Sequence, residues 1–101
     1  MARRQGVASD ARAPARARAG RAESAAEIAR EAAEEFKGDG RPRWVLGSVG
    51  PGTKLPSLGH APFALLRDAY EQQVAGLVAG GADAILIETA QDLLQAKAAI
   101  I

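Results

Sequence analysis

Two short apolar segments, each followed at once by polar or glycine-rich residues, constrain the fold of this chain most. They are the residues from Trp44 to Leu46 or Val49 and the residues from Ala84 to Ile87. Both segments predict buried β-strands, and the helical pattern between them predicts a crossover that leaves the two strands side by side and parallel. The sequence therefore indicates an α/β fold built from βα repeats, in which functional residues lie where the strands end.

Three helices are predicted around these strands. The first should start at a capping box formed by Ser24 and Glu27 and end near Lys37. The second should begin at Pro62 and stop at the next pair of glycines. The third should begin near Asp92, whose carboxylate suits a helix N-terminus. The predicted order is therefore helix, strand, helix, strand, helix.

The length of the chain bounds what it can form. With 101 residues, it can hold at most one small domain. Two parallel strands need cover on both faces and leave two open edges, and the helical pattern still continues at Ile100-Ile101. We therefore expect residues 23–101 to be an internal piece of a larger α/β domain.

The first 22 residues differ in composition from the rest. They contain six arginines and one aspartate, a net charge of +5, so the remainder of a chain with net charge +1 carries −4. This segment has few aliphatic side chains to bury, and we expect it to be a disordered Arg/Ala-rich tail. Three other roles remain open: a nucleic-acid-binding arm, an organelle transit peptide and a twin-arginine signal. The absence of interleaved aromatic residues makes nucleic acid an unfavoured partner.

Several classes of site are excluded by composition. The chain has no cysteine, so it can form neither a disulfide nor a thiolate metal site, and a single His60 cannot build a zinc site unaided.

No apolar run approaches the roughly 18 residues that a membrane-spanning helix needs. We expect a soluble, cytoplasmic protein without a membrane partner.

The glycine-rich segment after the first strand, Gly47–Gly52, invites comparison with phosphate-binding loops. Its glycines do not have the order of a dinucleotide fingerprint, and Thr53-Lys54 reverses the order required in a P-loop. The segment therefore predicts a tight chain reversal and argues against nucleotide binding.

Glu88 is the strongest candidate functional residue, because it directly follows the second strand. It could bind a substrate there, or it could cap a neighbouring loop or pair with an arginine. His60 is interpreted as a loop residue, and Asp92 and Lys97 as helix-capping or solvent-facing residues. No catalytic residue and no metal ligand is assigned.

A long ordered set of segments resembles the homocysteine-binding domain family of cobalamin-dependent methionine synthases, from about residue 24 to residue 101. The segments that carry this resemblance are Gly47–His60, Leu66–Val74, Gly80–Asp83, Ile87–Thr89 and Gln91–Ile100. The resemblance implies a (β/α)8 TIM barrel, of which this chain would hold about two strands, the third and fourth, with their flanking helices.

The resemblance also implies the chemistry. In this family, a zinc ion held by three cysteines binds the sulfur of homocysteine, and the resulting thiolate takes a methyl group from methylcobalamin, which is recharged from methyltetrahydrofolate. The glutamate of the Ile-Glu-Thr motif, matched here by Glu88, helps to bind the amino acid end of homocysteine. The implied partners are homocysteine, the rest of the barrel, and the cobalamin- and folate-binding domains.

Two departures from the family limit what this chain can do alone. It lacks the three cysteines, and it lacks the first barrel strand with its substrate contacts. We therefore expect it to bind neither zinc nor cobalamin and to be inactive by itself. Alternative functions are a homocysteine methyltransferase that uses betaine or S-methylmethionine without cobalamin, and a non-catalytic interaction fragment whose basic arm binds nucleic acid.

Overall fold

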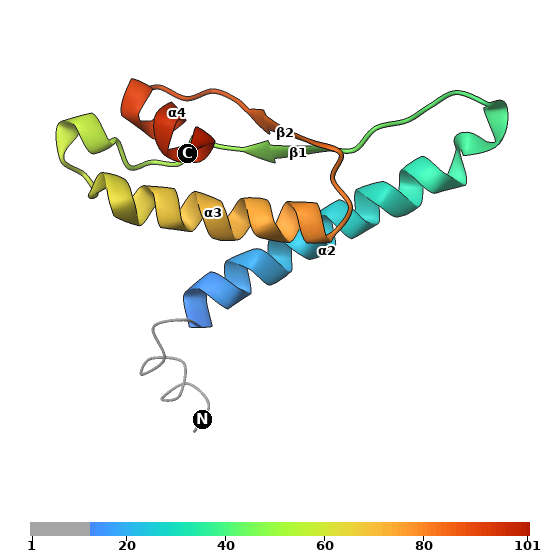
Figure 1. The fold of residues 1–101 in the computed structure, drawn as a ribbon, viewed down its shortest axis with the longest axis horizontal. Helices are drawn as coiled ribbons and strands as arrows, with labels where there is room; N and C mark the ends of the chain where they lie inside the picture. Colours follow the sequence, from blue (N-terminus) through green and yellow to red (C-terminus); the bar gives the residue numbers. More distant parts are fainter. Residues whose placement is uncertain (1–12) are drawn as a thin grey trace.

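A computed structural model describes residues 13–101. Its helices and strands are α2 (Ala13–Glu35), the short 3-10 helix η1 (Lys37–Asp39), β1 (Leu46–Val49), the 3-10 helix η2 (Pro56–Leu58), α3 (Phe63–Ala79), β2 (Ala84–Ile87) and α4 (Leu93–Ile100). Figure 1 shows α2 and α3 on the same side of the two strands, with η2 and α4 at the end towards which both strands run.

The two strands form a parallel pair, as the sequence predicts. Leu46 is paired with Ala84, and Val49 is paired with Ile87. The first strand begins two residues later than its earliest predicted position, because the exposed Trp44 precedes the ladder. The βα repeat is therefore confirmed, with α3 as the crossover between the strands.

The two faces of this sheet have different surroundings. On the face towards α3, Gly47 and Val49 are buried and Ile85 and Ile87 are half-buried. On the other face, Leu46 is 58% exposed and Leu86 is 44% exposed. Within residues 13–101, no helix covers this second face, which we call the open face of the sheet. The expected cover on both faces is thus present on one face only in the described residues.

The core lies between the covered face of the sheet and the helices. It consists of Ala26 from α2, Val49 from β1, Tyr70 and Leu77 from α3, and Ala98 from α4. A Cβ atom at Gly47 would lie 2.9 Å from the Leu77 Cδ1 atom. The glycine in β1 therefore lets the backbone of the strand approach α3 closely.

The structure corrects the prediction for the start of the chain. Residues 13–22 belong to α2, so the expectation of a disordered tail is wrong for them, and residues 1–12 lie outside the described residues. Ser24 lies in the middle of α2 and does not begin a helix, so the predicted capping box at Ser24 and Glu27 is also wrong.

Small residues explain why α2 is ordered without large apolar side chains. A Cβ atom at Gly76 of α3 would lie 2.2 Å from the Ala19 carbonyl oxygen, and one at Gly80 would lie 2.3 Å from the Glu23 carbonyl oxygen. The two helix backbones are thus in direct contact, and Ala22 packs on the core. Because the two backbones approach so closely, van der Waals contacts between backbone and alanine atoms take the place of contacts between large aliphatic side chains.

An arginine ties α2 to the beginning of both strands. The Arg30 guanidinium donates hydrogen bonds to the Gly81 carbonyl oxygen at 2.5 Å and to the Asp83 carboxylate at 2.5 Å. Asp83 also accepts a hydrogen bond from the Val45 backbone N–H at 2.8 Å. Two hydrogen bonds lower the pKa of Asp83 below its usual value. The larger cause is the bond from the Val45 N–H, and the smaller is the bond from the Arg30 guanidinium. This contact joins the helix layer to the amino ends of the strands.

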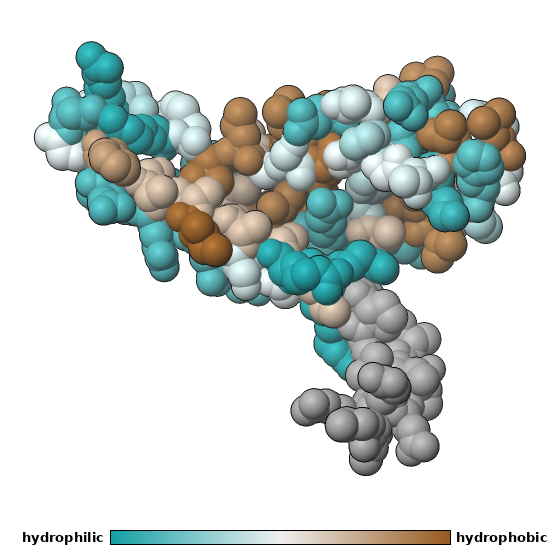
Figure 2. Space-filling view, turned by 180° about the vertical axis from the view of Figure 1, so that it is seen from behind, coloured by the Kyte–Doolittle hydropathy of each residue, from teal (hydrophilic) through white to brown (hydrophobic). Residues whose placement is uncertain are grey.

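Hydrophobic residues reach the surface in several places. Figure 2 shows brown groups interspersed with polar ones across the upper half of the molecule, where the strands and α4 lie. Large exposed side chains include Trp44, Leu46, Leu86, Leu93 and Ile100. Among residues 13–101, none of the helices has the length and apolar character needed to cross a membrane.

Candidate functional site

The candidate site is the carboxyl end of the two strands on the open face. Glu88 follows β2 directly, and its backbone N–H continues the ladder by donating to the Val49 carbonyl oxygen at 3.1 Å. The Glu88 side chain is exposed, and its Oε1 atom accepts a hydrogen bond from the Ser48 hydroxyl of β1. The structure thus joins a predicted site residue to a serine that the sequence did not single out.

The surroundings of Glu88 bear on its two alternative roles. Among the residues that the structure describes, no lysine or arginine is ion-paired with this carboxylate. Its side-chain hydrogen bond goes to a strand residue, Ser48, and not to the backbone of a loop. A solvent-facing carboxylate with one oxygen bound by a hydroxyl can still accept hydrogen bonds from a cationic ligand.

The backbone on either side of this site is tightly constrained. Thr89, the next residue after Glu88, has a φ of 56°, which is uncommon for a β-branched residue. Such conformations are often found at functional sites. Gly50, just after β1, has a φ of 92°, and a Cβ atom there would lie 2.9 Å from the Glu88 carbonyl oxygen. Glycine is therefore required for the loop after β1 to lie against Glu88.

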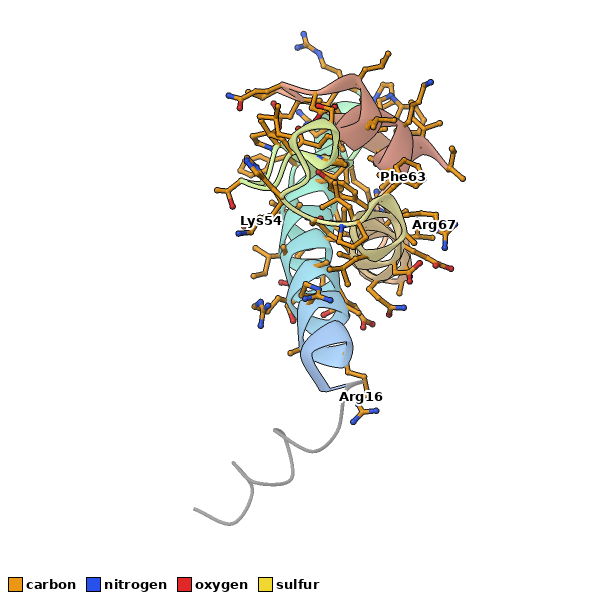
Figure 3. All side chains as sticks on the ribbon, turned by 90° about the vertical axis from the view of Figure 1, so that its left-hand side faces the viewer. Arg16, Lys54, Phe63 and Arg67 are labelled. Carbon is orange, nitrogen blue, oxygen red and sulfur yellow. The ribbon has the colours of Figure 1, made fainter. Side chains whose placement is uncertain are left out.

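The loop between β1 and α3, residues 50–62, is held by side chains from two helices. The Tyr70 hydroxyl donates to the Pro51 carbonyl oxygen at 3.2 Å, and the Gln95 amide donates to the Lys54 carbonyl oxygen at 3.2 Å. Gln95 is 1% exposed, and burial raises the pKa of Tyr70. Figure 3 looks onto this end of the molecule, with Lys54 on the loop and Phe63 and Arg67 at the start of α3. The predicted chain reversal is therefore a loop with defined anchors.

Asp92 anchors the same loop and begins α4, as predicted. Its carboxylate accepts hydrogen bonds from the Leu94 backbone N–H at 2.8 Å and from the Ser57 backbone N–H at 3.0 Å. The Ser57 hydroxyl donates a further bond at 2.5 Å and is the main reason why the pKa of Asp92 is lowered. The helix start and the loop are thus fixed by one side chain.

His60 and Lys97 take the structural places that the sequence predicts. The His60 Nδ1 atom accepts a hydrogen bond from the Leu55 backbone N–H at 3.2 Å within the loop. Lys97 lies in the last turn of α4, where its positive charge favours the helix C-terminus. Neither residue is brought to Glu88 by a hydrogen bond or ion pair among residues 13–101.

Sequence reasoning missed three polar residues of this region: Ser48, Ser57 and Gln95. Ser48 belongs to the glycine-rich segment that predicts a chain reversal, whereas the structure places it in β1, beside the second strand. Gln95 could have been noticed as a polar side chain on the inner face of a helix, since such groups need a hydrogen-bond partner when buried. Ser57 carries no sequence signal of its own, because its partner Asp92 lies 35 residues away.

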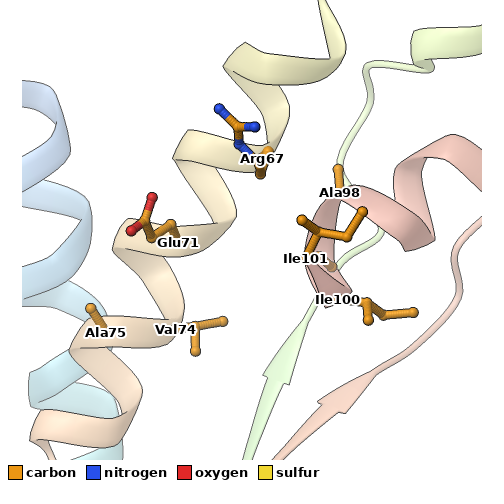
Figure 4. A pocket seen from close by; sticks show the side chains of 8 residues that line it. Arg67, Glu71, Val74, Ala75, Ala98, Ile100 and Ile101 are labelled. Atoms are coloured by element: carbon orange, nitrogen blue, oxygen red, sulfur yellow. The ribbon is translucent and has the colours of Figure 1, made fainter.

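A separate groove lies between α3 and α4. It has a volume of about 550 Å³ and is lined by Arg67, Glu71, Val74, Ala75 and the residues from Ala98 to Ile101. Figure 4 shows Arg67 and Glu71 on successive turns of α3, with Ile100 and Ile101 across from them. Neither Ser48 nor Glu88 lines this groove, so it does not belong to the candidate site.

The described residues do not form a metal site. Among residues 13–101, no three side chains of histidine, cysteine, aspartate or glutamate lie close enough together to hold an ion. The whole chain has no cysteine. A three-cysteine zinc site of the kind that the resemblance implies therefore does not fit the residues of this chain.

Comparison with known proteins identifies the family. A family model described as "Homocysteine S-methyltransferase" matches residues 4–101. This match begins earlier than the expected start of the resemblance at about residue 24, which agrees with the inclusion of residues 13–22 in a packed helix. No solved structure matches the chain.

Two curated relatives are methionine synthases from mycobacteria. The chain is 60% identical over 74 residues to the methionine synthase of Mycobacterium tuberculosis (strain ATCC 25618 / H37Rv) and 55% identical over 74 residues to that of Mycobacterium leprae (strain TN). Each match covers 73% of this chain but only 6% of the relative's length. The chain belongs to the homocysteine S-methyltransferase family.

Proposed function

We propose that this chain is part of the homocysteine-binding domain of a methionine synthase, in which Glu88 binds the ammonium group of homocysteine. The complete protein would transfer a methyl group from methylcobalamin, recharged from 5-methyltetrahydrofolate, to homocysteine and so form methionine. The family match and the high identity to two methionine synthases support this proposal.

The observation that carries the proposal is the position of Glu88. Its exposed carboxylate follows β2 at the carboxyl edge of the parallel pair, which is where α/β folds bind their ligands. A carboxylate facing an ammonium group forms a charge-assisted hydrogen bond, which is stronger than a bond between neutral groups. Glu88 would therefore recognise the amino acid end of the substrate.

We further propose that β1 and β2 are the third and fourth strands of a (β/α)8 barrel. Leu46, Ser48 and Leu86 on the open face would then point into the barrel, where the other strands cover them. The helices α3 and α4 would lie outside. This arrangement accounts for the large exposed side chains on one face of the pair.

Zinc and cobalamin would be bound by other parts of the complete protein. The chain has no cysteine for the zinc ion, and among residues 13–101 no three possible metal ligands lie together. Its own residues would supply scaffold and one substrate-binding carboxylate. A transferase that uses betaine or S-methylmethionine is the alternative within the same family. A cobalamin-binding domain encoded in the same gene would favour the methionine synthase, and its absence would favour the alternative.

The proposal is tested by Glu88→Gln in a complete homocysteine-binding domain that contains this chain, which we call the complete domain. The change keeps the shape of the side chain and removes its charge. Binding of homocysteine should weaken by about 1.5–3 kcal/mol, the range for a hydrogen bond to a charged group. Isothermal titration gives the affinity.

Two further readouts separate binding from structure. Zinc content and melting temperature should not change, since Glu88 is proposed neither as a zinc ligand nor as a core residue. Unchanged affinity together with a lower melting temperature would show instead that Glu88 stabilises the loop beside it.

A further inference from the structure

Ser48 and Glu88 are placed together by the register of the strands. Ser48 is paired with Leu86, and Glu88 lies two residues after Leu86, directly past the end of β2. Because side chains alternate along a strand, Ser48, Leu86 and Glu88 share the open face. The serine hydroxyl is thus the side-chain donor that the neighbouring strand presents to the Glu88 carboxylate.

The direction of this hydrogen bond follows from its chemistry. An ionised carboxylate only accepts hydrogen bonds, so the Ser48 hydroxyl is the donor and the Glu88 Oε1 atom is the acceptor. The Oε2 atom has no protein hydrogen-bond donor among residues 13–101. One oxygen is therefore held by the protein while the other stays available to a ligand.

The backbone of Glu88 is already fixed by other contacts. Its N–H is bonded to Val49 in the ladder, and its carbonyl oxygen lies against Gly50. The remaining freedom is in the side chain, whose several rotatable bonds would otherwise let an exposed carboxylate sample many positions. A bond from Ser48 removes much of this freedom before any ligand arrives.

We propose that Ser48 is a positioning residue for substrate recognition, whose hydroxyl orients the Glu88 carboxylate so that its second oxygen meets the ammonium group of an amino acid substrate. This inference rests on the proposed function, since it requires that Glu88 binds homocysteine. It adds a residue to the site and gives that residue a role that depends on the ammonium group of the ligand.

The test compares Ser48→Ala and Ser48→Thr in the complete domain, with Ser24→Ala as a matched control. Ser24 is an exposed serine on α2, remote in the chain from both strands. Two ligands are titrated: homocysteine, and 4-sulfanylbutanoate, which has the same thiol and carboxylate but no amino group. Melting temperatures are recorded for every variant.

Ser48→Ala should weaken homocysteine binding about three- to tenfold, which is the effect of losing one ordinary hydrogen bond. Binding of 4-sulfanylbutanoate should not change, because that ligand does not use Glu88. Ser48→Thr keeps a hydroxyl and should retain most of the affinity, and Ser24→Ala should behave as the unmodified domain. In a Glu88→Gln background, Ser48→Ala should cause a smaller further loss than it does alone.

The outcomes distinguish this inference from the function on which it rests. If Glu88→Gln weakens homocysteine binding but Ser48→Ala does not, the role of Ser48 is refuted and the proposed function stands. If Ser48→Ala weakens both ligands equally, Ser48 acts on the structure and not through the ammonium group, which also refutes the inference. If Glu88→Gln has no effect on homocysteine, the proposed function itself fails.

Discussion

The two faces of the parallel strand pair differ in what covers them and in the residues that they present. On the covered face, Gly47 and Val49 pack against α3 and contribute to the core. On the open face, alternate residues of the same strands, Ser48 and the exposed Leu46, have no helix over them within residues 13–101. Glu88 extends the open face past the end of β2.

The covered face therefore contributes mainly to the stability of the fold, and the open face mainly to the binding of a ligand. The covered face has small and aliphatic residues whose replacement would disturb packing, whereas the open face carries the candidate site at its carboxyl end. A substitution on one face should therefore change mainly the free energy of unfolding, and one on the other mainly ligand binding.

The largest effect is expected for Leu77, which packs on the covered face of the sheet, in comparison with Leu46 on the open face. Leu77 of α3 is 6% exposed and packs on the covered face, so Leu77→Ala should lower the free energy of unfolding by about 2–5 kcal/mol. Leu46→Ala on the open face should change it by less than about 0.5 kcal/mol in the 101-residue chain. Chemical denaturation measures both values.

The same Leu46→Ala change in the complete domain sharpens the comparison. If the open face points into a barrel, Leu46 becomes buried there, and the loss should rise to about 2 kcal/mol or more. Equal small losses in the chain and in the complete domain would contradict the barrel arrangement that we propose.

The next effect concerns the helices that cover the sheet. Gly76→Ala would place a methyl group against the Ala19 carbonyl oxygen, so α2 and α3 would have to separate, at a cost of about 1–3 kcal/mol. Gly20→Ala is the matched control, because Gly20 lies in α2 with no atom within 4 Å of the added Cβ. That change should stabilise the helix by about 0.5–1 kcal/mol. Thermal melting that shows two stabilising changes would contradict the close contact of the helices.

The smallest effect concerns Asp92 and its dependence on pH. Because hydrogen bonds lower the pKa of Asp92 below 3.8 in the folded state, its ionised form contributes stability above that value. This contribution is lost as the pH falls through the lower folded-state pKa. Asp92→Asn should therefore lower the melting temperature at neutral pH, and the difference from the unmodified chain should shrink as the pH falls below the usual pKa of an aspartate and through the lower folded-state value. A difference that stays constant with pH would argue against a role for the charge.

Much of the fold can be predicted from the sequence where local patterns act alone. The strand Ala84–Ile87 and the helix start at Asp92 follow from an apolar run and a capping carboxylate, and both are found at the predicted residues. The start of α2 carries no large apolar side chains that would predict a packed helix. It is packed because Gly76 and Gly80 allow the backbone of α3 and its C-cap to lie directly against alanines of α2. Such contact depends on residues more than 50 positions apart, which no local pattern reveals.

The residues of the candidate site also differ in how far the sequence alone identifies them. Glu88 could be found from its position after a strand, since that position is fixed by the chain itself. Its partner Ser48 depends on strand register, and the anchors of the loop, Tyr70 and Gln95, depend on how the helices pack. The partners of these residues become recognisable only when the elements are brought together in space.

The central claim, that Glu88 recognises an ammonium group, is tested most directly by discrimination between two ligands. The ratio of the dissociation constants of 4-sulfanylbutanoate and homocysteine is measured in the complete domain, with and without Glu88→Gln. We predict a clear preference for homocysteine in the unmodified domain, reduced by about tenfold or more in the variant. The same ratio in both proteins would contradict the assignment of Glu88 to the substrate.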